Sequence, residues 1–195
     1  MNNVAGVNIF LLIALPILLV SCEKEKKSLP MDADGNTYST IVIGTQTWLN
    51  ENLKTTKYTN GDPIPLAADN TGWTDFTRGA YCWYENNINY KDSYGALYNG
   101  YAGRASSFIC PVGYHVPSLE EWSELVNFLS NDLDAKQQFV KGQFGWRVWN
   151  GSFSKYPCSW WIYTSSGSTY RITNDFLITS MPINSGYYIR CLKDN

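Results

Sequence analysis

The sequence has few charged residues, no excess of positive charge and a single histidine. Charged side chains make up 16% of the 195 residues, and the formal net charge is −2. Because acidic and basic residues are interspersed, the chain offers no basic stripe, and we expect no nucleic acid among its partners. His115 is the only imidazole, and no nucleophile motif such as Gly-x-Ser-x-Gly accompanies it. We therefore expect His115 to be structural.

Zinc-type cysteine spacing is also missing. No Cys-x-x-Cys pair occurs, so we expect no structural metal site, and nothing in the sequence implies a cofactor. Besides Cys22 the chain has an even number of cysteines, and in an exported protein an even number indicates disulfide bonds. They are Cys82, Cys110, Cys158 and Cys191. Four cysteines allow three pairings, and the spacing does not choose among them.

Long apolar runs are absent except at the start of the chain. Residues 4–20 are mostly apolar, contain no Lys or Arg and lead into Ser21 and Cys22. A membrane-spanning helix needs about 20 apolar residues, whereas this run is shorter and contains Pro16. A small residue before cysteine is the pattern at which a lipoprotein-processing peptidase cleaves. A plain signal peptide or an uncleaved anchor is the alternative, since the first three residues lack the usual basic side chain.

We therefore expect a bacterial lipoprotein anchored at the outer membrane or the cell surface through an acylated Cys22. Its parts would be a signal peptide (1–21), a flexible tether (22–30) and one domain (31–195). The tether is charged and poor in apolar residues, so it should stay solvated. The domain has a suitable size for a single hydrophobic core.

Aromatic residues are abundant, with 8 Trp, 14 Tyr and 8 Phe. Buried Tyr and Trp need partners for their polar atoms, so we expect some to be half-exposed and available to a ligand. Core packing is the alternative for any one of them. Trp160 and Trp161 are adjacent on an expected strand and should face opposite sides of it. The candidate ligand-binding residues are Trp149, Trp160, Trp161, Tyr163 and Tyr170, with Trp146 in the same cluster.

Helix signals are concentrated in the middle of the chain. Ser118 and Glu121 have the spacing of a capping box, and an apolar face with helical spacing follows. This pattern predicts a helix over residues 118–130, and a shorter helix is expected over 132–140. Alternating and β-branched segments predict strands on both sides of these helices, at 37–43, 46–49, 146–149, 159–164, 170–173, 176–180 and 187–192. The composition therefore favours an α+β domain with short antiparallel strands.

Acidic residues give two weaker signals. The segment from Asp32 to Asn36 resembles a calcium loop, but Ile43 would occupy the twelfth position, where an EF-hand places a bidentate glutamate. A turn is the better interpretation. Glu120 and Glu121 are neighbours on the expected helix and point in different directions, so they do not predict a glycosidase pair.

Several strings, in order along the chain, carry a family resemblance. They are DGNTY (34–38), IGTQTWLNENLK (43–54), YTNGDPIP (58–65), AYCWY (80–84), YGALYN (94–99), CPVGYHVP (110–117) with EW (121–122), and YIRC (188–191). Together they resemble the Fibrobacter succinogenes major paralogous domain, a family of lipoproteins and surface proteins of the Bacteroidetes–Fibrobacteres group. The chain departs from the family pattern at Gly100 and over 134–150, and the usual Gly-Gly-Tyr-Arg stretch is missing.

The resemblance implies a C-type-lectin-like fold whose ends are joined by a disulfide between Cys110 and Cys191. It leaves Cys82 and Cys158 as a second pair. No sugar-selecting Glu-Pro-Asn triplet is present, so calcium-free stacking is expected over calcium-dependent sugar binding. The sequence thus predicts an anchored, non-catalytic binding module for carbohydrate or a surface protein. An enzyme acting on polysaccharide and a structural component of the cell envelope are the alternatives, since a fold does not settle function.

Overall fold

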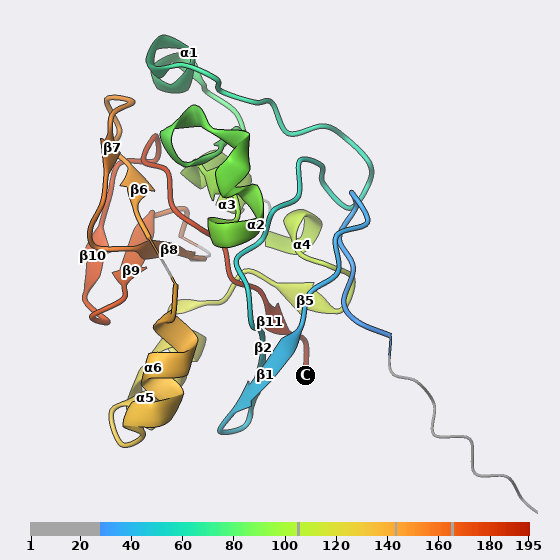
Figure 1. Ribbon diagram of the computed structural model, residues 1–195, viewed down its shortest axis with the longest axis vertical. Helices are drawn as coiled ribbons and strands as arrows, with labels where there is room; N and C mark the ends of the chain where they lie inside the picture. The colour runs from blue at the N-terminus through green and yellow to red at the C-terminus, as the bar shows by residue number, and fades with distance from the viewer. Residues whose placement is uncertain (1–27, 105, 143, 165) are drawn as a thin grey trace, which may run out of the picture.

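The computed structural model describes residues 28–104, 106–142, 144–164 and 166–195. The expected signal peptide, the acylated Cys22 and most of the tether lie outside these ranges. Among the described residues, no helix combines the length and the apolar character needed to cross a membrane. The described chain is a mixture of helices and short antiparallel strands (Figure 1), so the expected α+β class is confirmed.

A four-stranded antiparallel sheet joins the start of the domain to its C-terminal strand. Its strands, in the order β1-β2-β11-β5, are β1 (Thr40–Ile43), β2 (Gln46–Leu49), β11 (Leu192–Lys193) and β5 (Tyr114–His115). The hairpin between β1 and β2 turns at Gly44, whose φ of +59° favours glycine. Trp48 on β2 is fully buried and lies opposite Leu192. The sheet therefore connects segments from both ends of the domain (Figure 1).

A second, three-stranded sheet divides the core in two. It consists of β10 (Ile178–Ser180), β9 (Tyr170–Thr173) and β8 (Ser159–Ile162), in that order. Every residue of β8 is buried. Trp160 belongs to one hydrophobic cluster and Trp161 to the other. Because successive side chains of a strand point to opposite faces, β8 supplies one tryptophan to each half of the core.

Helix α5 (Leu119–Leu129) begins where the sequence predicts. The Ser118 side chain accepts from the Glu121 N–H, and the Glu121 carboxylate accepts from the Ser118 N–H, which completes the capping box. Trp122, Leu125 and Leu129 form its buried face. Helix α6 (Leu133–Val140) follows, with Asp132 as its N-cap, so both expected helices are confirmed.

Smaller elements complete the domain. The two-stranded sheets pair β3 (Tyr81–Cys82) with β4 (Leu97–Tyr98) and β6 (Trp146–Arg147) with β7 (Phe153–Ser154). The short helices are α1 (Asn70–Asp75), α2 (Lys91–Tyr94), α3 (Gly100–Arg104) and α4 (Ser106–Ile109), with 3₁₀ turns η1 (Tyr84–Asn86) and η2 (Ile88–Tyr90). No periodic pattern in the sequence predicts these short helices.

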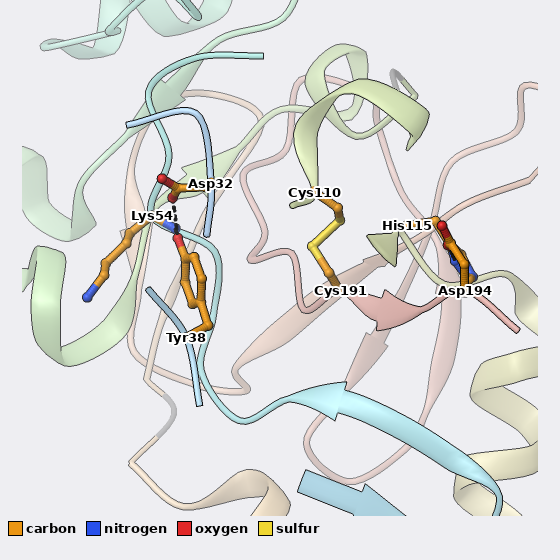
Figure 2. The surroundings of a disulfide bond; sticks show 7 residues. All are labelled: Asp32, Tyr38, Lys54, Cys110, His115, Cys191 and Asp194. Atoms are coloured by element: carbon orange, nitrogen blue, oxygen red, sulfur yellow. Dashed lines mark hydrogen bonds and ion pairs between the residues drawn. A yellow bond between two sulfur atoms is a disulfide. The ribbon is translucent and has the colours of Figure 1, made fainter. Parts of the chain in front are cut away.

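One disulfide joins Cys110 to Cys191, with an S–S distance of 2.04 Å (Figure 2). This is the pairing that the family resemblance implies. The second expected bridge is wrong, because Cys82 and Cys158 are buried free thiols. Burial raises the pKa of both thiols, and a nearby guanidinium, Arg147 for Cys82 and Arg190 for Cys158, offsets this rise only in part.

A tyrosine-lined pocket as the candidate functional site

A surface pocket of about 350 Å³ lies between the start of α5 and the adjoining ends of β8 and β9. Its lining combines two aromatic rings, one carboxylate and several hydroxyl groups. The lining residues are Ser118, Leu119, Glu120, Tyr163, Thr164, Ser166 and Tyr170. Pockets that bind small ligands combine apolar walls with a few polar groups that fix orientation, and this pocket has both.

Backbone pairing holds the two tyrosines in place. The N–H of Tyr163 donates to the carbonyl of Pro117 at 2.9 Å, and Tyr163 forms a parallel bridge with Ser118. Tyr170 is the first residue of β9 and lies opposite Ile162 of β8. Both tyrosines are half-buried. The strand ends and the N-cap of α5 thus fix one ring each at the pocket wall.

Several polar atoms of the pocket remain available. Within the part of the chain that the structure describes, the Glu120 carboxylate and the hydroxyls of Tyr163 and Tyr170 make no hydrogen bond or ion pair. Glu121, in contrast, is occupied by the capping box. An unoccupied carboxylate can accept from ligand hydroxyls, and a phenol can both donate and accept.

The loop between β8 and β9 supplies further hydroxyls. Thr164 Oγ1 donates to the carbonyl of Ser168 at 2.5 Å, and Ser166 Oγ lies 3.3 Å from Ser168 Oγ. Gly167, at φ +76°, allows the chain to turn here. A hollow of about 10 Å³, with a mostly apolar lining that includes Trp161, adjoins the pocket and shares Tyr163 and Thr164 with it. The pocket therefore continues into a narrow, mostly apolar hollow.

The structure separates the aromatic residues that the sequence analysis grouped together. Tyr163 and Tyr170 line the pocket. Trp160 is 0% exposed, so its ring cannot stack on a ligand, and its prediction as a ligand contact is wrong. Trp161 is 2% exposed; it lies outside the pocket lining and faces only the small adjoining hollow. Both rings are buried because β8 lies between two hydrophobic clusters. Trp149 is 55% exposed but follows β6, outside the pocket lining.

Sequence reasoning missed the polar half of the pocket. The sequence patterns at Ser118 and Glu120 concern only the helix cap and acid pairing, and no motif marks Thr164 or Ser166. A usable signal was present, since the stretch from Thr164 to Thr169 is rich in hydroxyl residues and lies between two aromatic strands. What the sequence could not show is that this loop meets the start of α5.

His115 connects three elements and contacts two carboxylates. Its Nδ1 lies 2.7 Å from Asp194 Oδ1, and its Nε2 lies 2.9 Å from Glu121 Oε1. Figure 2 shows His115 and Asp194 side by side near the disulfide. These contacts tie β5 to the capping box of α5 and to the residue that follows β11. The arrangement fits the expected structural role of His115.

The segment that begins at Asp32 forms a turn rather than a cation site. The Asp32 carboxylate accepts from the N–H groups of Asp34 and Asn36, and from the hydroxyl of Tyr38 at 2.5 Å (Figure 2). The Tyr38 hydroxyl in turn accepts from the N–H of Lys54. Among the described residues, no group of three or more His, Cys, Asp or Glu side chains could hold a metal ion. The turn predicted from the sequence is confirmed.

The fold and the pocket define a class of small α+β domains that are closed by one disulfide and carry an aromatic, hydroxyl-rich surface site. Residues 41–157 match the family described as the Fibrobacter succinogenes major domain. Since the match covers more than half of the chain, the protein belongs to this family. No curated protein and no solved structure matches it. The match includes Ser118 and Glu120 but ends before Tyr163 and Tyr170, so the pocket spans the family region and the segment beyond it.

Proposed function

We propose that this protein is a non-catalytic module of the bacterial cell envelope that binds glycans. The observation that carries the proposal is the pocket in which two half-buried tyrosines lie beside the Glu120 carboxylate and several hydroxyls. Aromatic rings stack on the apolar C–H faces of sugars, and hydroxyls and carboxylates bind the sugar hydroxyls. The pocket offers both kinds of contact within one volume.

Binding is favoured over hydrolysis by the number of acids in the pocket. Glycoside hydrolases use two carboxyl groups that lie about 5 to 9.5 Å apart. Glu120 is the only carboxylate among the described residues that line this pocket. A single carboxylate suits recognition of sugar hydroxyls, and it does not supply both the acid and the base of a hydrolytic pair.

The location and the finer fold are parts of the same proposal. An acylated Cys22 would hold the domain at the outer membrane or the cell surface, as the apolar segment that ends at Cys22 indicates. A C-type-lectin-like arrangement is supported by the Cys110–Cys191 bridge and by the sheet that contains both β1 and β11.

The test is a titration of the folded protein with soluble polysaccharides and oligosaccharides, followed by calorimetry. Tyr163→Ala and Tyr170→Ala should each weaken binding about fivefold, since an aromatic contact contributes on the order of 1 kcal/mol. Glu120→Gln should also weaken it, while a calcium chelator should have no effect.

The matched control is Trp149→Ala, which removes an exposed aromatic ring outside the pocket. It should leave the affinity unchanged. Equal losses in Trp149→Ala and Tyr163→Ala would contradict the assignment of the pocket. Saturable binding to a surface protein, with no glycan binding by the folded domain, would replace the glycan with a protein ligand.

A further inference from the structure

An apolar groove of about 640 Å³ lies beside the four-stranded sheet, at the start of the described chain. Three segments that are far apart in the sequence form it: the N-terminal segment, the turn before β5 and the strands of the sheet. Its lining residues are Ser28, Leu29, Pro30, Met31, Thr40, Thr47, Val112, Tyr114 and Lys193. Figure 1 shows β1, β2, β5 and β11 on the side of the molecule where the N-terminal segment and the C-terminus also lie.

The groove presents large apolar side chains to solvent. Leu29 is 55% exposed, Met31 58% and Val112 88%. Exposed single apolar residues are ordinary, but a cluster of them beside a groove marks an interaction surface. The protein therefore keeps apolar groups uncovered at one place where its fold brings three segments together.

The turn that carries Val112 is fixed by its neighbours. The N–H of Tyr114 donates to the carbonyl of Pro111 at 2.9 Å, and Gly113 has φ +80°, as the third position of a type II turn requires. Cys110, just before the turn, is held by the disulfide. Val112 thus occupies the apex of a well-defined turn.

The N-terminal side of the groove is fixed as well. Met31 forms an antiparallel bridge with Thr37, and the N–H of Tyr38 donates to the carbonyl of Pro30 at 3.0 Å. The Asp32 turn described above closes this segment on itself (Figure 2). Leu29 and Met31 are therefore held on the surface of the domain.

Charge and chain length indicate what covers the groove. None of the described lining residues is acidic, and Lys193 is the only charged one. Five residues separate Ser28, in the groove, from Cys22, and the six Cα–Cα steps between them span at most about 22 Å in an extended chain. Lys24, Lys26 and Lys27 lie within this tether together with Glu23 and Glu25, so that its net charge is +1. An acyl chain on Cys22 would hold the groove close to anionic headgroups, which attract nearby lysines.

We propose that this groove docks on the lipid headgroup layer of the membrane that carries the anchor, with Leu29, Met31 and Val112 entering the interface. The inference rests on the proposed acylation of Cys22. The docking would give the domain a defined orientation. The edge of the domain that contains the groove would contact the membrane, and the β8–β9–β10 sheet would face away from the membrane. Apolar side chains that enter the headgroup boundary beside a basic residue are the usual basis of interfacial binding.

The test uses the full processed chain reconstituted in vesicles of phosphatidylethanolamine and phosphatidylglycerol. A nitroxide is attached to Val112→Cys and, as a matched control, to Leu177→Cys. Leu177 is 61% exposed and lies just before β10. Figure 1 shows β10 on the side of the molecule opposite the N-terminal segment. The label at 112 should gain contact with oxygen and lose contact with a water-soluble nickel chelate when the protein is anchored. The label at 177 should not change.

Flotation of the vesicles and mass spectrometry of the N-terminal peptide report on the anchor separately. Protein that is acylated and floats, but whose two labels are equally accessible to the chelate, would overturn the docking and leave the anchor intact. Protein that neither floats nor carries an acyl group would overturn both. Spin–spin broadening at position 112 without membrane would identify a second copy as the occupant, and would overturn the lipid assignment. A nitroxide on Met31→Cys should likewise be protected from the chelate in the anchored protein. The double substitution Leu29→Asp/Val112→Asp should abolish this protection while flotation persists.

Discussion

Two arginines are buried in the core, and neither forms an ion pair with a described residue. Arg147 is 0% exposed and Arg190 is 1% exposed. The guanidinium of Arg147 lies 4.5 Å from the Trp73 ring centre and 4.8 Å from that of Phe153. Five hydrogen bonds to neutral acceptors compensate its desolvation, two of them to the carbonyls of Ala67 and Asp69. One side chain thus holds together the loop before α1, η1 and the turn after β6.

Replacement of Arg147 by lysine should destabilise the domain. Lysine keeps the charge but cannot reproduce the planar set of donors, so several buried acceptors would lose their partner. We expect a loss of about 3 kcal/mol in the free energy of unfolding, measured by urea denaturation. Arg78→Lys is the control, since Arg78 is exposed, and it should change stability by less than about 0.5 kcal/mol. Equal stability of the two variants would contradict the role given to Arg147.

The two free thiols should be unreactive in the folded protein. Burial raises the pKa of the Cys82 thiol to about 11 and raises that of Cys158 further, and only a thiolate reacts with a disulfide reagent. Peptide mapping after treatment with such a reagent should find neither residue modified in the native state. Both should be modified after unfolding without reductant, while Cys110 and Cys191 stay unmodified. Protection of Cys82 and Cys158 in the unfolded chain would indicate that they form a disulfide after all.

The tryptophans of β8 show where reasoning from individual residues fails. The alternation of side chains along a strand correctly places Trp160 and Trp161 on opposite faces. It cannot reveal that both faces are covered, because the residues that cover them come from distant parts of the chain. Trp160 Nε1, for example, donates to the side chain of Asn52 at 2.8 Å, and Trp161 Nε1 donates to the carbonyl of Tyr98 at 2.7 Å. Burial here is a property of the tertiary fold.

At the level of elements, helix α5 is the clearest case in which local sequence determines local structure. Its capping box, its apolar face and its boundaries follow from residues within a single segment. The hairpin of β1 and β2 and the strand β9 are similar cases. Residues 187–192 behave differently: a strand is expected throughout, but only β11 at its end is regular, while Tyr187 and Tyr188 form isolated bridges to β4 and β8. These bridges depend on partners that the sequence does not identify.

The N-cap of α5 should contribute measurably to stability. Ser118→Ala removes the acceptor for the Glu121 N–H, and loss of an N-cap costs about 1 kcal/mol. Ser123→Ala is the matched control in the same helix. Its hydroxyl bonds back to the carbonyl of Leu119, and alanine is at least as favourable there. Thermal unfolding should therefore show a lower Tm for Ser118→Ala and little change for Ser123→Ala. A reversed order would contradict the capping assignment.

For the molecule as a whole, the buried tyrosines predict a loss of stability at alkaline pH. Burial raises the pKa of Tyr187 to about 12 and raises those of Tyr98 and Tyr188 well above their ordinary value. In the unfolded chain these phenols ionise near pH 10. As the pH rises above about 10, the unfolded state releases protons that the folded state retains, and the free energy of unfolding falls.

Denaturant titrations at increasing pH should show this decline, and the absorbance of tyrosinate should show which groups ionise. The buried tyrosines should titrate together with the loss of structure. Stability that remains constant to pH values well above 10 would contradict the burial of these phenols.

Strand β11 lies between β2 and β5 in the sheet, yet it follows every other strand along the chain. During synthesis, the ribosome therefore releases the β1–β2 hairpin and β5 long before the strand that joins them. Cys110 likewise precedes its partner by 81 residues, and in that interval it can meet the thiols of Cys82 and Cys158. Completion of this half of the domain must wait for β11, so the order of synthesis makes the sheet one of the last parts of the protein to form.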